Sequence, residues 1–333
     1  MLEIDGSFGE GGGQILRTAL SFSVLTKKPF RLVNIRAKRP NPGLAKQHIT
    51  AIETLKKISN STTNFVSVGS KEIEFFPGDL EGGEYSFDIG TAGSITLVLQ
   101  SAILPALFGN KETKLLLKGG TDVKWAPPID YITHVFLQIL RKMGAELEIE
   151  VLSRGYYPKG GGLVCIMIRP SILKKFYCNE RGSMLGIFGK INITNLNNSI
   201  AERMEKTARA MLAYENFEIV TERCKGIGTG VGILLFANFE NTVIGSDSLG
   251  EIGLPAEKVV EFAVKEMTKE LDSFSTVDVH AADMLLPYIA VAGGGSFYVR
   301  EITEHTRTNI EIIKKFLDVE FKVESGKIEC EKK

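Results

Sequence analysis

Three segments of the chain follow one plan, and this internal repeat limits the available folds more than any other feature of the sequence. Each segment has a glycine- or alanine-rich approach to an apolar helix, then a β-rich stretch, a polar loop, a second amphipathic helix and closing strands. The three approaches lie at residues 11–17, 91–94 and 280–283. The repeat therefore predicts a mixed α/β (α+β) fold in which one structural unit occurs three times.

The spacing of apolar residues predicts the helices of these units. In the first unit a helix runs over 11–25, and Ile49, Ile52 and Leu55 share one face of a second helix. Pro287 should kink or end the helix that opens at 280–283. The predicted strands are 30–35, 114–118 and 296–300. The second helix of the second unit is marked by Ile132, Phe136, Ile139 and Met143, and that of the third unit by Ile310, Ile313, Phe316 and Leu317.

A segment with a different pattern separates the second unit from the third. It reads as a strand at 187–193, a helix at 201–214, strands at 217–222 and 231–237, and a helix at 255–271. We interpret residues 181–275 as an inserted α/β domain, within a main domain made of residues 1–180 and 276–333. No long linker flanks the insert, so it should pack against the main domain.

Composition excludes several classes of protein. Of the 333 residues, 44% are hydrophobic and 24% charged, which is typical of a globular protein and excludes disordered, collagenous and small disulfide-rich chains. The 40 basic residues balance the 40 acidic ones, so a polyanion must be bound by a local patch. The four cysteines are far apart, and the N-terminus has no basic region and no apolar run. We therefore expect a soluble cytoplasmic protein that does not enter a membrane.

A glycine cluster at 6–13 ends where a helix is predicted to begin. Backbone N–H groups at a helix N-terminus favour an anion, and glycine lets the backbone approach a phosphate closely. Glu10 lies within the cluster, where a carboxylate beside a phosphate would suit Mg²⁺. The same cluster would also serve as a tight turn from strand to helix.

A basic patch follows this cluster. Residues 27–57 contain nine lysines and arginines against one acid, Glu53. Arg36 and Arg39 precede a proline- and glycine-containing loop, from which their guanidinium groups should be free for bidentate contact with phosphate. The alternative is a solvated charged surface.

The four histidines differ in their surroundings. His48 shares the face of Ile52 and should be semi-buried, whereas His134 should be exposed. His305 precedes Thr308 and Glu311, which have the spacing of a capping box, so it should lie at a helix entrance where a neutral imidazole could attack phosphorus. His280 and Asp283 are one turn apart and would equally suit a structural hydrogen bond.

Taken together, these residues predict a phosphate-handling α/β protein. The more specific hypothesis gives it a histidine nucleophile, and the simpler one makes it a binding module.

Five motifs in order resemble those of the RNA 3'-terminal phosphate cyclase family, and the match runs from the first residues to the last helix: 5–17, 35–48, 90–94, 118–122 and 157–162. The resemblance implies three tandem repeats of two helices and a four-stranded sheet, each similar to the C-terminal domain of translation initiation factor three. It also implies that the inserted domain is thioredoxin-like and interrupts the third repeat.

The resemblance further implies a reaction. ATP would be used, with Mg²⁺ or Mn²⁺, to convert an RNA 3'-terminal phosphate into a 2',3'-cyclic phosphodiester, with release of AMP and pyrophosphate. The steps would be adenylylation of a histidine, transfer of AMP to the RNA 3'-phosphate, and attack by the neighbouring 2'-hydroxyl. A homodimer is left open.

The family's functional positions fall on named residues of this chain. His305 matches the nucleophile, and Glu10 matches a carboxylate near the metal. Met284 departs from the family, which often has glutamine there, so a side-chain hydrogen bond from this position is in doubt. The phosphate site would be lined by Arg17, Arg36, Arg39 and Gln47, and the adenosine pocket by Gln100, Pro127, His280, Ala281, Ala282, Asp283 and Met284.

Two alternatives accompany this resemblance. A related branch keeps the fold, lacks the nucleophile and acts in ribosomal RNA processing without catalysis, but His305 in its motif argues against that branch. The fold also resembles enolpyruvyl transferases, which would not need a histidine at this helix entrance.

Overall fold

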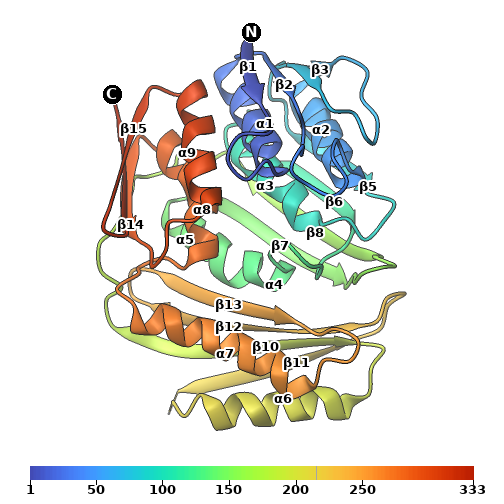
Figure 1. The fold of residues 1–333 in the computed structure, drawn as a ribbon, viewed down its shortest axis with the longest axis vertical. Coiled ribbons are helices and arrows are strands. Elements are labelled where there is room, and N and C mark those ends of the chain that lie inside the picture. Colours follow the sequence, from blue (N-terminus) through green and yellow to red (C-terminus); the bar gives the residue numbers. More distant parts are fainter. Residues whose placement is uncertain (215) are drawn as a thin grey trace.

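The structure is a computed structural model that describes residues 1–214 and 216–333, and Figure 1 shows its arrangement. The described residues form four sheets of four strands each. The first repeat contains β1 (Leu2–Asp5), α1 (Gln14–Thr26), β2 (Phe30–Val33), α2 (Lys46–Ser59), β3 (Thr62–Thr63) and β4 (Ile73–Phe76). The second contains β5 (Gly83–Asp88), α3 (Ile95–Ala106), β6 (Thr113–Gly119), the consecutive helical segments α4 (Ile129–Tyr131), η1 (Ile132–Phe136) and α5 (Leu137–Lys142), β7 (Glu146–Ser153) and β8 (Gly162–Arg169).

The third repeat is split by the insert. It contains β9 (Phe176–Cys178) and then, after the insert, α8 (Val279–Val291), β14 (Gly294–Tyr298), α9 (Glu304–Phe316), β15 (Val319–Glu324) and β16 (Lys327–Lys332). The insert contains β10 (Met184–Thr194), α6 (Asn198–Met211), β11 (Phe217–Cys224), β12 (Gly230–Phe239), β13 (Val243–Leu249) and α7 (Ala256–Asp272).

All three repeats have the same strand topology. The first strand pairs parallel with the second, the second antiparallel with the fourth, and the fourth antiparallel with the third. A parallel pair needs a crossover, and the first helix of each repeat provides it. The predicted mixed α/β fold of repeated units is confirmed, while the likeness to translation initiation factor three stays a prediction.

Four strands were missing from the predicted elements: the opening strand of each repeat, and β13 of the insert. Each repeat opens with a strand before its first helix, and in the third repeat β9 precedes the insert. Within the insert, β13 was missed because its sequence contains Gly245, Ser246, Asp247 and Ser248, residue types that are depleted in strands. Pairing with β12 nevertheless completes the insert's sheet in the order β11-β10-β12-β13.

Helices from the three repeats pack on one another and share a core. The first helix, α1, contacts both α3 and α9, and α8 contacts α9. Phe22 of α1 stacks on Phe316 of α9, with the ring centroids 6.1 Å apart. Each apolar helix face is thus buried by a neighbouring unit, as expected for repeats that cannot bury it alone. The polar ends of α1, α8 and α9 are brought together by the same packing.

The insert has a separate hydrophobic core beneath its own sheet, formed by side chains between Ile187 and Met267. In Figure 1 the insert lies at one end of the molecule, with α6 and α7 facing away from the repeats. The proposed division of the chain at residues 180/181 and 275/276 stays a prediction.

A buried ion network joins the insert to the second repeat. Arg154 is fully buried and contacts Asp122, Asp130 and, in the insert, Glu222, at 3.3, 2.8 and 2.7 Å. Lys190 of the insert completes the network with contacts to Asp130 and Glu222. Because a buried charge is stable only when it is paired, this network favours a fixed contact between the two parts.

Other expectations were wrong in detail. His134 was expected to be exposed, but its ring stacks on Phe236 of the insert at 5.2 Å, because η1 faces the insert's sheet. Pro287 does not end its helix, since α8 continues to Val291, and the other expected effect, a kink, stays a prediction. None of the described helices is long and apolar enough to cross a membrane.

Candidate active site

His305 lies in the first turn of α9. Thr303 caps this helix, because its side chain accepts a hydrogen bond from the backbone N–H of Thr306. The predicted capping box at Thr308 and Glu311 was wrong: both residues lie inside the helix, which begins four residues earlier than Thr308. The expectation that His305 lies at the start of a helix is correct, and its side chain is 46% exposed.

Both nitrogens of His305 have close partners from the first repeat. Nδ1 lies 2.8 Å from the amide oxygen of Gln14, and Nε2 lies 2.6 Å from a carboxylate oxygen of Glu10. Gln14 is the first residue of α1, and Glu10 belongs to the glycine cluster that precedes it. The packing of α1 against α9 therefore brings the motif that contains Glu10 and Gln14 to the imidazole of His305, which is distant in sequence.

The amide of Gln14 fixes the tautomer of His305. Its nitrogen donates to Oδ2 of Asp283 at 2.9 Å, and an ionised carboxylate can only accept. The amide oxygen must then face His305 and accept the proton of Nδ1. This network assigns the free lone pair of a neutral His305 to Nε2, the nitrogen that faces Glu10.

Asp283 of α8 is held by residues of two other helices, α1 and α9. Its backbone carbonyl accepts from Asn309 of α9 at 2.7 Å, and Asn309 accepts in turn from the hydroxyl of Thr18 in α1. Burial raises the pKa of the Asp283 carboxyl, while the nearby charges of His305, His280 and Arg17 oppose that rise. These buried hydrogen bonds position the carboxylate that orients Gln14.

The glycine cluster packs tightly against polar side chains. A Cβ at Gly13 would lie 2.4 Å from Nε2 of His48, and one at Gly12 would lie 2.8 Å from Nη2 of Arg39. Only glycine fits at these positions without displacement of a neighbour. His48 is 3% exposed, as its predicted semi-buried role requires, and its Nδ1 accepts from the backbone N–H of Ala45. Burial, with the charges of Arg17 and Arg36, lowers the pKa of His48 to about 3.

The predicted phosphate residues surround this cluster. Arg17 donates to Gln100 at 3.2 Å, and burial lowers its pKa to about 10, which keeps it charged at neutral pH. Gln47 accepts from the backbone N–H of Ser94 at 2.9 Å. Arg36 and Arg39 were expected to be free, but Arg36 donates to the carbonyl of Gly43 and Arg39 pairs with Glu10. Each guanidinium uses some of its five N–H donors in these contacts, and its other donors can bind a ligand.

A small cavity between α1, α3, α8 and α9 joins some of the predicted adenosine residues. Its walls include Arg17, Gln100, Asp283 and Met284. Pro127 lies outside the lining, although its carbonyl accepts from Thr96, one turn before Gln100 in α3.

The first turns of α8 hold the other predicted adenosine residues. His280 is exposed, and its ring lies edge-on to that of Tyr131, with centroids 6.3 Å apart. The side chains of Ala281 and Ala282 are buried in the core. These two alanines can therefore offer little more than backbone atoms to a ligand.

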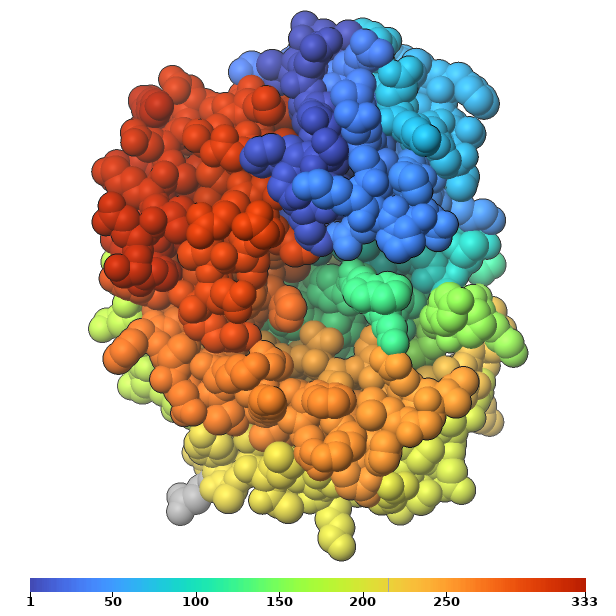
Figure 2. Space-filling model, viewed as in Figure 1, coloured from blue at the N-terminus to red at the C-terminus, as the bar shows by residue number. Residues whose placement is uncertain are grey.

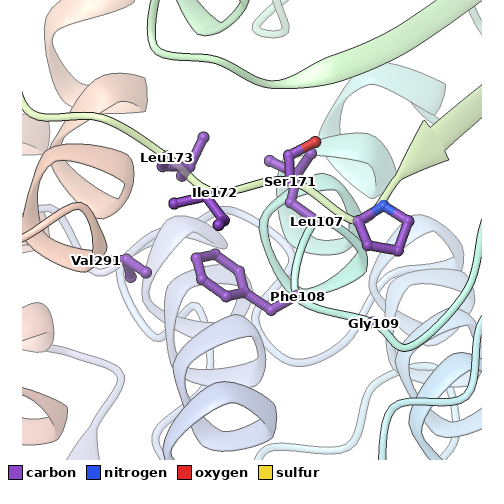
Figure 3. A pocket seen from close by; sticks show the side chains of 8 residues that line it. Leu107, Phe108, Gly109, Ser171, Ile172, Leu173 and Val291 are labelled. Atoms are coloured by element: carbon purple, nitrogen blue, oxygen red, sulfur yellow. The ribbon is translucent and has the colours of Figure 1, made fainter.

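A larger hollow of about 410 Å³ lies elsewhere and contains none of the predicted site residues (Figure 3). Its lining is mainly apolar and includes Leu107, Phe108, Ile172 and Val291, which approach one another from separate segments in Figure 3. The larger of these two hollows is therefore not the one that contains the predicted site residues.

Several known proteins that are similar to this chain share one name. A profile of the family "RNA 3'-terminal phosphate cyclase" matches residues 8–323. The chain belongs to this family. Proteins named RNA 3'-terminal phosphate cyclase from Archaeoglobus fulgidus and Saccharolobus solfataricus are 46% and 47% identical to it over 331 residues, which cover 98% of this chain and 99% and 97% of theirs.

Another relative has the same name, and one solved structure of a different enzyme is only weakly similar. The protein of that name from Pyrococcus furiosus is 44% identical over 330 residues, 98% of this chain and 96% of its own. A solved EPSP synthase from Acinetobacter baumannii is 14% identical over 53% of this chain and 49% of its own, with a TM-score of 0.23, which is too low to carry an argument.

Two residues of this cyclase-family site were given no role by the sequence reasoning. Gln14 contacts His305, and Asn309 holds Asp283. Both are buried polar residues, Gln14 on α1 and Asn309 on the amphipathic α9, and this is the signal that could have revealed them, because buried polar groups need partners. Their partners are distant in sequence and become neighbours only through the packing of the repeats.

Proposed function

We propose that this protein converts an RNA 3'-terminal phosphate into a 2',3'-cyclic phosphodiester at the expense of ATP, through a covalent His305–AMP intermediate and an RNA adenylate. The observation that carries this proposal is the environment of His305, whose Nδ1 is held by Gln14 while Nε2 faces the glycine cluster and Glu10. Membership of the cyclase family supports the same reaction.

The first step forms the enzyme adenylate. Nε2 of His305 attacks the α-phosphorus of ATP, an N–P bond forms, and the bond to the bridging oxygen breaks with release of pyrophosphate. Gln14 stabilises the imidazole because its amide oxygen accepts a hydrogen bond from Nδ1–H as positive charge develops on the ring. The phosphoramidate is a high-energy bond, so the AMP can be transferred onward.

The next two steps complete the cycle. An oxygen of the RNA 3'-phosphate attacks the phosphorus of the adenylate, and the N–P bond breaks to return His305. The 2'-hydroxyl then attacks the activated 3'-phosphorus, loses its proton and expels AMP. Arg17, Arg36, Arg39 and Gln47 would bind the phosphates, since guanidinium groups suit phosphate oxygens.

Adenosine would bind beside α3 and α8. In this proposal Gln100, Pro127, Met284 and the segment 280–283 contact the nucleoside, and the small cavity at Gln100, Asp283 and Met284 supports that role. The reaction would take place in the cytoplasm, as the sequence predicted. Met284 stands where the cyclase family often has glutamine. Its thioether is a weak hydrogen-bond acceptor and cannot replace the amide of a glutamine.

Glu10 fits a divalent cation bound together with ATP phosphates. Its Oε2 is buried and has no hydrogen-bond partner within residues 1–214 and 216–333, although it lies 2.6 Å from Nε2 of His305. A carboxylate facing an imidazole lone pair is unfavourable unless the ring is protonated or a cation lies against the oxygen. Mg²⁺ often uses one carboxylate plus substrate phosphates, which agrees with the absence of any cluster of three ligating side chains in the described chain. The ion would neutralise phosphate charge.

The test is incubation with α-labelled ATP and Mg²⁺ or Mn²⁺, followed by denaturing separation. We expect protein-bound AMP that is acid-labile and alkali-stable, and that disappears in His305→Ala. The matched control is His134→Ala, which should retain the label because His134 contacts the insert instead. A label on His305→Ala would refute the assignment. No label on folded wild-type protein would favour the non-catalytic role in RNA processing.

A further inference from the structure

Three loops of the second repeat meet around Ala92, next to the proposed phosphate site. A Cβ at Gly120 would lie 2.5 Å from the carbonyl oxygen of Ala92, and one at Gly160 would lie 3.0 Å from its Cα. The backbones of Asp122 and Tyr156 are also bridged in parallel. The loops 90–94, 120–128 and 154–162 therefore form one surface rather than three separate tips.

Two aromatic side chains project from this surface, and we call Trp125 and Tyr157 the aromatic ridge. Trp125 is 96% exposed and Tyr157 is 78% exposed. Trp125 also has a positive φ of 62°, which is rare for a bulky residue and costs free energy. A folded protein gains nothing from holding an indole in water in a strained conformation, so the arrangement indicates a ligand for the ring.

The charge around the ridge is positive. Lys159 lies two residues after Tyr157, and Lys225 lies on the adjoining loop of the insert. Within the part of the chain that the structure describes, neither ammonium, nor that of Lys46, has a carboxylate within 4.0 Å. Lys124 is paired with Glu251. In a chain with no net charge, unpaired lysines beside exposed aromatic rings form a local site for a polyanion with flat groups.

The ridge is continuous with the phosphate site. The Ser94 N–H that Gln47 binds belongs to the same loop as Ala92, and a Cβ at Gly90 would lie 3.6 Å from Nζ of Lys46. Figure 2 shows the green segment near residue 125 within a hollow bordered by the blue N-terminal repeat and the orange part of the insert. A bound polymer whose terminal phosphate lies near Gln47 would therefore extend from there over the loops of the ridge.

The insert supports this surface from below. A Cβ at Gly161 would lie 2.3 Å from Cγ1 of Ile227, so the loop that carries Tyr157 presses directly on the insert. Asn195 of the insert donates to the carbonyls of Gly226 and Gly228 and thereby fixes the loop that carries Ile227. These contacts give the insert a role in positioning the ridge.

We propose that the aromatic ridge stacks on unpaired bases of the RNA just upstream of its terminal phosphate, while Lys159 and Lys225 contact the RNA backbone. Stacking accepts any base and needs a single strand, because paired bases hide their faces. This inference rests on the proposed function, since it assumes that the ligand ending at Gln47 is RNA. It adds a subsite that selects single-stranded 3' ends without selecting sequence.

Trp125 is the only tryptophan of the chain, so its fluorescence reports on the ridge alone. We would titrate the full-length protein with a short single-stranded RNA that ends in a 3'-phosphate, with a nucleoside 3'-phosphate, and with a blunt duplex of the same strand. Quenching is expected with the single strand and not with the other two. Equal quenching by the duplex, or none by the single strand, would overturn the proposal.

Kinetics provide the second measurement. Trp125→Ala should raise KM for the single-stranded RNA about tenfold, which is in the range of one lost base stack, and Trp125→Phe should restore most of it. The rate of protein–AMP formation should change less than KM for RNA, because Trp125 is not assigned to the nucleoside, although Pro127 of the same loop is. Phe274→Ala is the matched control, since Phe274 is 95% exposed, follows α7 and lies outside the loops of the ridge, and its loss should leave KM unaltered.

The two proposals fail in different ways. If wild-type protein forms no AMP adduct and cyclises no RNA, the proposed function is wrong, whatever the fluorescence shows. If wild-type protein cyclises RNA but Trp125→Ala has an unchanged KM, only the ridge is wrong.

Discussion

The amide oxygen of Gln14 lies 2.8 Å from Nδ1 of His305, although the two residues are 291 positions apart in the sequence. Because the amide nitrogen is committed to Asp283, the amide cannot rotate without losing a hydrogen bond. Gln14 therefore transmits the orientation of a buried carboxylate to the imidazole. It is a positioning residue, since it acts on the reaction through His305.

Replacement of Gln14 by leucine should slow the formation of protein-bound AMP by ~10- to 100-fold, the usual effect of losing a partner that orients a functional histidine. ATP binding should change less than the rate, because Gln14 contacts the nucleophile directly and forms only one part of the cavity assigned to adenosine. Single-turnover kinetics with labelled ATP measure the rate, and equilibrium binding of ATP provides the comparison. Asp283→Asn is the intermediate case, because its amide can still accept from Gln14. An unchanged rate in Gln14→Leu would contradict the positioning role.

Gly13→Ala should destabilise the fold around the glycine cluster by ~1–3 kcal/mol, the range for overpacking. The new methyl group would lie 2.4 Å from His48 and 3.1 Å from Arg17, and buried His48 cannot move away freely. Denaturant unfolding measures the change. Gly109→Ala is the control, since its nearest neighbour would be a carbonyl oxygen at 3.2 Å. Equal losses in both variants would mean that the cluster is not tightly packed.

The protein should lose stability in mild acid through His48. Its pKa is about 3 in the folded state and 6.5 in the unfolded chain, so between these values the unfolded chain binds one more proton. The free energy of unfolding is therefore unaffected by His48 above pH 6.5 and decreases as the pH falls from 6.5 toward 3. The loss should be ~2 kcal/mol between pH 7 and pH 5. His48→Gln keeps an acceptor for Ala45 and should flatten that part of the stability curve. A curve that His48→Gln leaves unaltered would exclude this cause.

Arg154→Met should destabilise the contact between the insert and the second repeat by ~3–5 kcal/mol, because Asp122 and Asp130 would keep buried charges without their main partner. Thermal unfolding monitored in parallel by two probes measures the loss. Arg203→Met is the control: it removes a solvent-exposed pair with Glu257 and should leave the stability almost unchanged. Similar losses in the two variants would show that burial does not matter at Arg154.

Much of the fold follows from local patterns. The apolar periodicity of the segments around Ile52, Ile139 and Ile313 predicts the second helix of each repeat, and all three are present. Short, polar strands carry less information, which is why β13 and the opening strands of the repeats were missed. Helix starts are similarly weak, since the Thr308 capping pattern competed with the true cap at Thr303.

The sequence by itself determined the motifs: a glycine cluster with Glu10, the arginines that follow it, and His305 near the start of a helix. Only the tertiary structure decided which of these meet. The contact of Gln14 with His305 and that of Arg154 with Glu222 join segments from different units, and the pairing of Arg39 with Glu10 joins two loops of the first repeat. Such contacts have no local signal, because they arise when three amphipathic units bury their apolar faces together and carry the polar ends of their helices into one place.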